Sequence, residues 1–135
     1  KKMGQLGKRV DPNWVRKEKG KLFRVINLGP QEQSLEGQTA VFIIWHGGVR
    51  PAWVYVGTSR NLARDLQECK ANEDILYFER FGGLFVSWCY IRKEFQAGAA
   101  RYLTQIAKPQ VDNPLAPSAA VDAIPVMLPG AKPTV

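Results

Sequence analysis

The clearest structural signal in the chain lies in residues 40–66, AVFIIWHGGVRPAWVYVGTSRNLARDL. Residues 40–45 and 52–56 are uncharged runs of β-branched and aromatic side chains, a composition typical of strands. Gly47-Gly48 and Pro51 lie between the two runs and interrupt regular pairing. We therefore expect a β-hairpin with an irregular connection, and we expect His46, just after the first run, to be a surface or turn histidine.

A helix is expected directly after this hairpin. Gly57 follows the second strand run, where glycine can adopt a backbone conformation closed to other residues. Thr58 or Ser59 can cap a helix, and Leu62 and Leu66 have the i, i+4 spacing of its buried face.

Two further segments of the sequence predict regular secondary structure. Residues 84–91, LFVSWCYI, predict a third strand because of their aromatic and β-branched content. Residues 93–106 carry apolar side chains at helical spacing, and Lys108-Pro109 ends that helix. Residues 22–28 suit a strand or a docked extension, and residues 75–81 indicate no single type. The expected fold class is α+β, with a small three-stranded sheet flanked by helices and with extended tails.

The length of 135 residues favours one domain. We divide the chain into a basic arm (1–24), a domain (25–113) and a Pro/Ala-rich tail (114–135), which is either disordered or wraps along a neighbour. Residues 123–128 of this tail are apolar enough to dock on their own domain or on a partner. No apolar run is long enough to span a bilayer, and no secretory signal is evident. The expectation is a protein of the cytoplasm or another intracellular compartment, with Cys69 and Cys89 as reduced thiols.

The net charge of +7 is confined to one end of the chain. Residues 1–30 contain nine basic and two acidic side chains, whereas residues 31–135 contain ten of each. Such an arm could lie along phosphates, an acidic protein surface or an anionic membrane face. Trp14 within it could anchor a base or a groove but is more simply explained by packing on its own domain. The candidate nucleic-acid-binding residues are Lys1, Lys2, Lys8, Arg9, Arg16, Lys17, Lys19, Lys21, Arg24, Arg50, Arg60 and Arg64.

The order of these elements resembles the GIY-YIG nuclease domain over residues 40–113. Residues 40–44 lie where the family has Gly-Ile-Tyr, and Tyr55-Val56-Gly57 lies where it has Tyr-Ile-Gly. Asn61-Leu62 resembles the start of the family's first helix, and Lys108-Pro109 with Asp112-Asn113 resembles the Pro and Asn that close its core. The resemblance implies an antiparallel sheet.

The residues that carry the family's chemistry are largely replaced. Phe42 stands at the position of the first tyrosine and has no phenolic oxygen to take a proton. Asp65 stands at the position of the arginine, where a carboxylate would repel developing negative charge. Ala100 stands near the position of the metal-binding glutamate, and Glu94 lies on another helix face. The remnant site is therefore Phe42, Tyr55 and Arg64, with no metal ligands.

Three functions remain open at this point. The first is a catalytically inactive GIY-YIG-like domain that binds nucleic acid through the basic arm, with Arg50, Arg60 and Arg64 around the old cleft. The second is a structural or assembly subunit whose two tails contact neighbouring proteins. The third is a DNA endonuclease with an altered site, the only case that would require a cofactor, Mg²⁺.

Overall fold

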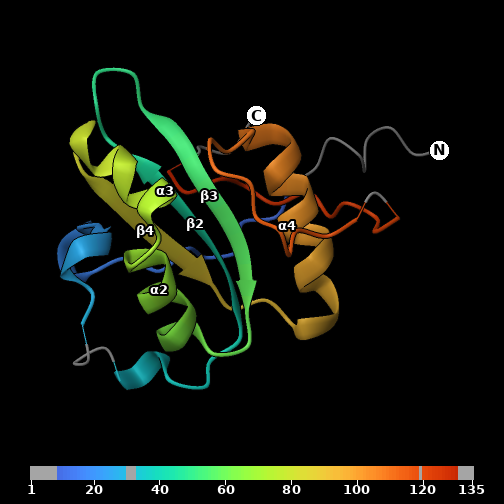
Figure 1. Ribbon diagram of the computed structural model, residues 1–135. Coiled ribbons are helices and arrows are strands. Elements are labelled where there is room, and N and C mark those ends of the chain that lie inside the picture. The colour runs from blue at the N-terminus through green and yellow to red at the C-terminus, as the bar shows by residue number, and fades with distance from the viewer. Residues whose placement is uncertain (1–8, 30–32, 119, 131–135) are drawn as a thin grey trace.

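The computed structural model describes residues 9–29, 33–118 and 120–130, and it confirms the α+β class. Within these residues there are four strands and three α-helices, joined by short 3₁₀ turns (Figure 1). The elements, in chain order, are η1 (Glu18–Gly20), β1 (Phe23–Arg24), η2 (Val25–Asn27), η3 (Gln33–Leu35), β2 (Ala40–His46), β3 (Ala52–Ser59), α2 (Leu62–Lys70), α3 (Glu73–Leu76), η4 (Tyr77–Arg80), β4 (Leu84–Cys89) and α4 (Lys93–Ala107).

The sheet has four strands rather than the expected three. Its order is β1-β4-β2-β3, and every pair is antiparallel. The additional strand is β1, which consists of Phe23 paired with Val86 and Arg24 paired with Phe85. Residues 22–28 were expected to form a strand or a docked extension, and the structure forms a strand at only two of them before the η2 turn.

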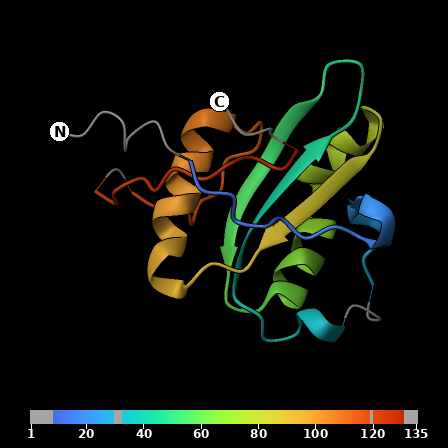
Figure 2. The ribbon, with the colours of Figure 1, turned by 180° about the vertical axis from the view of Figure 1, so that it is seen from behind.

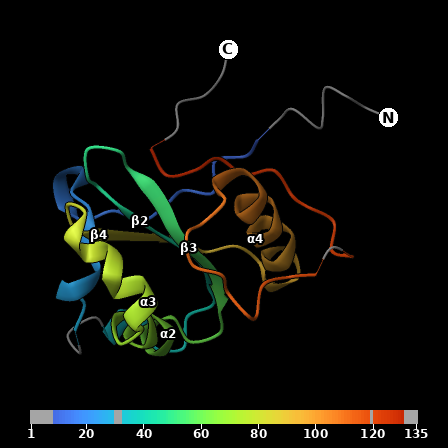
Figure 3. The ribbon, with the colours of Figure 1, turned by 45° about the horizontal axis from the view of Figure 1, so that its top comes forward.

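The two faces of the sheet are covered differently (Figure 3). One face packs on α2, α3 and the 3₁₀ turns, around buried Phe42, Ile44, Leu62, Leu66 and Trp88. The opposite face packs on α4, around Val41, Ile43, Ala99, Ala100 and Leu103. None of the helices in the described residues has the length and apolar character needed to cross a membrane.

A β-bulge interrupts the hairpin near its connection. Ile44 pairs with Tyr55 but Trp45 pairs with Trp53, so Val54 is the additional residue of β3. As a result Val54 and Tyr55 both contribute to the α2 face, whereas Trp53 packs on the α4 face. A strict alternation would have placed Trp53 and Tyr55 on one face.

The described parts of both termini lie against the domain (Figure 2). Residues before β1 cross the α4 face of the sheet, where the Val15 amide donates to the Trp88 carbonyl at 2.8 Å. Val10 forms a parallel bridge with Val126 of the tail, and the indole of Trp14 donates to the Met127 carbonyl at 2.6 Å. The packing explanation of Trp14 is therefore confirmed.

The tail crosses the middle of α4. The Ile124 amide donates to the Gly98 carbonyl at 3.0 Å, and Val126 is buried among residues of the α4 face. A Cβ built on Gly98 would lie 2.6 Å from the Ile124 side chain and 2.7 Å from the Asp122 carbonyl oxygen. The glycine thus supplies the space in which the tail crosses the helix.

Candidate functional site

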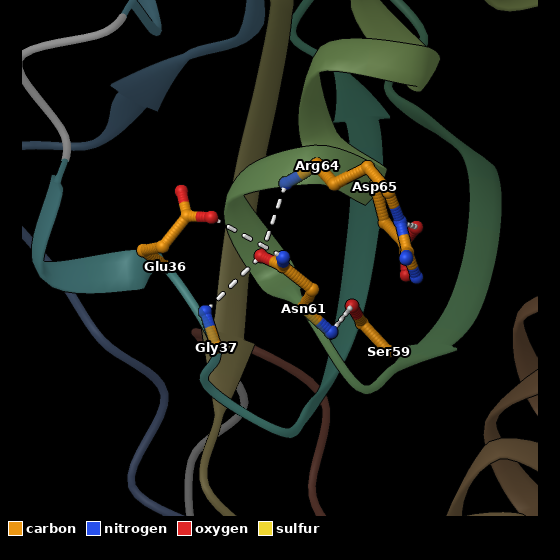
Figure 4. Close-up of polar contacts among 6 residues, drawn as sticks. All are labelled: Glu36, Gly37, Ser59, Asn61, Arg64 and Asp65. Carbon is orange, nitrogen blue, oxygen red and sulfur yellow. Dashed lines mark hydrogen bonds and ion pairs between the residues drawn. The ribbon is translucent and has the colours of Figure 1, made fainter.

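The first turn of α2 is held in place by Asn61 (Figure 4). The Oδ1 atom of Asn61 accepts from the amides of Gly37 at 3.1 Å and Arg64 at 3.4 Å. The amide of Asn61 donates to the Ser59 hydroxyl at 3.0 Å, and its Nδ2 donates to the Glu36 carboxylate at 3.4 Å. Asn61 is therefore the N-cap, whereas the sequence suggested Thr58 or Ser59, both of which belong to β3.

A cleft of about 540 Å³ opens between the end of β3, α2 and the first turns of α4. Three cations from separate elements line it, together with two carboxylates. Its polar lining consists of Thr58, Ser59, Arg60, Arg64, Asp65, Glu68, Lys93 and Gln96. The tertiary structure thus places Arg60 and Arg64 on one cleft, together with Lys93 and Gln96. In the sequence, the only indication that Lys93 and Gln96 lie on one surface is their i, i+3 spacing within the expected helix.

Arg64 and Asp65 form an ion pair in this cleft. The Nε atom of Arg64 lies 3.1 Å from Oδ1 of Asp65, and the Arg64 side chain is 59% exposed. An exposed pair of this kind contributes little stability. Its effect here is to oppose part of the positive charge that Arg64 presents.

Phe42 and Tyr55, which the resemblance to the nuclease domain singles out, do not form a proton-transfer site. Phe42 is buried with its ring centroid 6.0 Å from that of Tyr55. Burial raises the pKa of Tyr55 to about 12, and the nearby Cys69, Asp65 and Glu68 add to the rise. The phenol therefore keeps its proton at neutral pH and is a poor general base.

The position expected for a metal-binding glutamate is occupied by packing. Ala100 is buried against the sheet on the α4 face and has no oxygen ligand to offer. Glu94 is exposed and does not line the cleft. Among the described residues there is no group of three or more His, Cys, Asp or Glu side chains that could hold a metal ion.

The basic arm presents its cations on a fixed turn. The Lys17 amide donates to the Lys21 carbonyl at 2.8 Å and the Gly20 amide to the Lys17 carbonyl at 3.2 Å, which closes the turn. Lys19 at its apex has a φ of 61°. We name this surface the basic turn; its exposed cations are Arg16, Lys17, Lys19 and Lys21. Lys1, Lys2 and Lys8 lie outside the described residues, and Arg9 is exposed.

Arg24 serves the fold rather than an open surface. Its Nη2 atom lies 2.6 Å from Oε2 of Glu79, and its guanidinium lies 5.4 Å from the centre of the Phe85 ring. Oε1 of the same Glu79 accepts from the Leu84 amide at 2.8 Å. Arg24 thus fastens β1 to the segment before β4, and its charge is already paired.

The candidate cations do not converge on one site. The basic turn precedes β1 at one edge of the sheet, whereas the cleft lies at the β3 edge, three strand spacings or about 14 Å away. Arg50 lies in the β2–β3 connection, whereas Arg60 follows the opposite end of β3. The two ends of a strand of eight residues are about 23 Å apart. Arg50 therefore does not lie with Arg60 and Arg64 around this cleft, contrary to the expectation.

The expectation for His46 is also wrong. It is the last residue of β2, only 7% exposed, and its ring is parallel to that of Phe78 at a centroid distance of 6.0 Å. Burial between aromatic rings places it in the packing beneath the hairpin connection.

Comparison with models of known families, with curated protein sequences and with solved structures finds no match for this chain. Function is therefore inferred from its own residues.

Proposed function

We propose that the protein is a GIY-YIG-like domain that binds nucleic acid and does not cleave it. The observation that carries this proposal is the basic turn, in which Arg16, Lys17, Lys19 and Lys21 are all exposed on a backbone fixed against β4. A group of cations held in this way needs little ordering on binding, and phosphates release counterions when they meet it.

The cleft contributes a second, weaker contact. Arg60, Arg64 and Lys93 can each reach a phosphate, but Asp65 and Glu68 oppose them. Because the basic turn and the cleft lie at opposite edges of the sheet, one ligand that occupies both must pass across the domain. We therefore expect most of the affinity to reside in the basic turn.

Absence of cleavage follows from the same residues. Phe42 has no oxygen, Tyr55 holds its proton, and Ala100 lies in the packing of α4 where a metal ligand would be needed. In-line hydrolysis of a phosphodiester usually requires a cation at the leaving group. A cleavage assay with Mg²⁺ or Mn²⁺ on duplex, branched and single-stranded DNA is expected to give no product.

The test of binding compares two variants that each lose three positive charges. One is Lys17→Gln/Lys19→Gln/Lys21→Gln in the basic turn, and the other is Arg60→Gln/Arg64→Gln/Lys93→Gln in the cleft. The dissociation constant is measured against salt concentration by fluorescence anisotropy. We expect the slope of log affinity against log salt to fall by about 2 in the turn variant, since each phosphate contact contributes about 0.7 to 0.9.

The cleft variant should change that slope by less than the turn variant. Salt-independent binding, or equal affinity in the wild type and the turn variant, would overturn the proposal.

The assembly alternative stays a prediction. In the described residues, Val10, Trp14, Ile124 and Val126 are occupied by contacts within their own chain.

A further inference from the structure

A second exposed surface lies at the end of the sheet that carries the β2–β3 connection. Its five members are Val49, Arg50, Tyr77, Arg80 and Phe81, which we name the tip surface. Val49 is fully exposed, Tyr77 is 47% exposed and Phe81 is 41% exposed. Both arginines are also exposed. Figure 1 shows the β2–β3 connection beside the segment that contains η4.

The backbone beneath the tip surface is closely packed. The Gly47 amide donates to the Gly83 carbonyl at 3.2 Å, which ties the hairpin connection to the segment before β4. A Cβ built on Gly82, whose φ is +96°, would lie 2.8 Å from the Cα of Gly48. The ring of His46 lies below, 5.5 Å from that of Phe81. The exposed side chains therefore project from a preorganised support.

The chemistry of the tip surface combines aromatic rings with unpaired cations. The guanidinium of Arg80 lies 4.2 Å from the centre of the Tyr77 ring, and Tyr77 and Phe81 meet edge to face at 5.7 Å. Among the described residues, neither Arg50 nor Arg80 forms an ion pair. Rings and arginines of this kind are the groups on which unpaired bases stack, while the arginines attract phosphates.

The charged side chains around Tyr77 favour one path for a bound nucleic-acid strand. Tyr77 also borders a hollow lined by Glu73, Asp74 and Asp112. These carboxylates would repel a phosphate backbone, whereas Arg50 and Arg80 would attract it. A nucleic-acid strand would therefore run along the hairpin side of Tyr77.

We propose that the tip surface stacks unpaired bases, so that the protein binds single-stranded nucleic acid more tightly than a duplex. This inference rests on the nucleic-acid binding proposed above and adds the class of ligand. Bases in a duplex are already stacked on each other and cannot offer their faces to Tyr77 and Phe81.

The experiment measures binding of the full chain to a 20-nucleotide single strand that carries 2-aminopurine, and to the duplex of the same sequence. The variants are Tyr77→Leu and Phe81→Leu, which remove a ring but keep an apolar side chain. Phe95→Leu is the matched control, because Phe95 is an aromatic residue of similar exposure, 46%, on α4. Thermal unfolding of each variant establishes that it is folded.

We expect the wild type to quench 2-aminopurine fluorescence and to favour the single strand. Tyr77→Leu and Phe81→Leu should each weaken single-strand binding by about 5-fold to 100-fold and leave duplex binding unchanged. Phe95→Leu should change neither. Normal single-strand affinity in both folded tip variants, or a preference for duplex, would overturn this inference alone. Absence of binding by the wild type to either ligand would overturn the proposed function itself.

Discussion

The ring of Phe42 lies directly over the Cα of Gly57, its antiparallel partner on β3. A Cβ built on Gly57 would be 2.6 Å from Cζ of Phe42, and Phe42 is only 3% exposed. Gly57 is inside β3 rather than after it, and its φ is not positive. The glycine is therefore required for the space it leaves and not for an unusual backbone conformation.

Gly57→Ala should destabilise the protein by about 1–3 kcal/mol, because the buried Phe42 ring has little room to move. Urea denaturation measures the loss. Gly57→Ala should cost less free energy of unfolding when it is introduced into Phe42→Leu than when it is introduced into the wild type, because the smaller leucine leaves room for the new methyl. If the two substitutions act additively, the steric explanation fails.

Gly98→Ala should release the tail from α4. In an exposed helix this substitution stabilises by about 1 kcal/mol, but here the new methyl meets the Ile124 side chain and the Asp122 carbonyl. We expect faster amide hydrogen exchange in residues 122–128 and faster proteolysis there. The same substitution in a chain that ends at Val121 should instead be stabilising, and a loss of stability in both chains would contradict this account.

Asn61→Ala should cost about 0.5–2 kcal/mol, since it removes the acceptor for the Arg64 and Gly37 amides. It should also weaken any binding that depends on Arg60 and Arg64. Asn72→Ala is the matched control: Asn72 caps α3, accepting from the amides of Asp74 and Ile75, outside the cleft. Equal effects of the two variants on nucleic-acid affinity would show that Asn61 does not position the cleft.

The two thiols should resist alkylation at pH 8 and make the protein less stable in alkali. Burial raises the pKa of Cys69 and of Cys89 from 9.0 to about 12, with Asp65 and Glu68 adding to the rise at Cys69. Above pH 9 the thiols ionise in the unfolded chain but not in the folded one, so unfolding is favoured progressively between pH 9 and 12. Their contribution to stability is complete below pH 9.

The midpoints of urea denaturation between pH 8 and 10.5 measure this decline in stability. A thiol reagent should react with two cysteines in urea and with neither in the native protein, where both are buried. Cys69→Ala/Cys89→Ala should flatten the pH dependence over that range. Tyr55 acts in the same direction above pH 10, because its pKa is also raised to about 12. A decline of the same steepness in the alanine variant would assign it to other groups.

Local sequence patterns were sufficient to predict the hairpin, β4 and α4. Ala40–His46 forms β2 and Lys93–Ala107 forms α4, close to the expected limits, whereas β3, Ala52–Ser59, runs three residues beyond the expected strand. Each is marked by an apolar period that repeats over several residues, and such a period is set by which face is buried. That position 42 carries no phenol and position 65 no guanidinium was equally clear from the sequence, since it depends only on which side chains are present.

Contacts between segments far apart in the chain could not be predicted from local sequence patterns. The sequence shows Ala97-Gly98-Ala99-Ala100 as a stretch without a metal ligand, but only the fold shows that Gly98 seats the tail while Ala99 and Ala100 pack on the sheet. The same holds for the pairing of β1 with β4 and for the cleft that Lys93 and Arg60 both line. Side-chain identity and period are local properties, whereas pairing and burial depend on which segments the folded chain brings together.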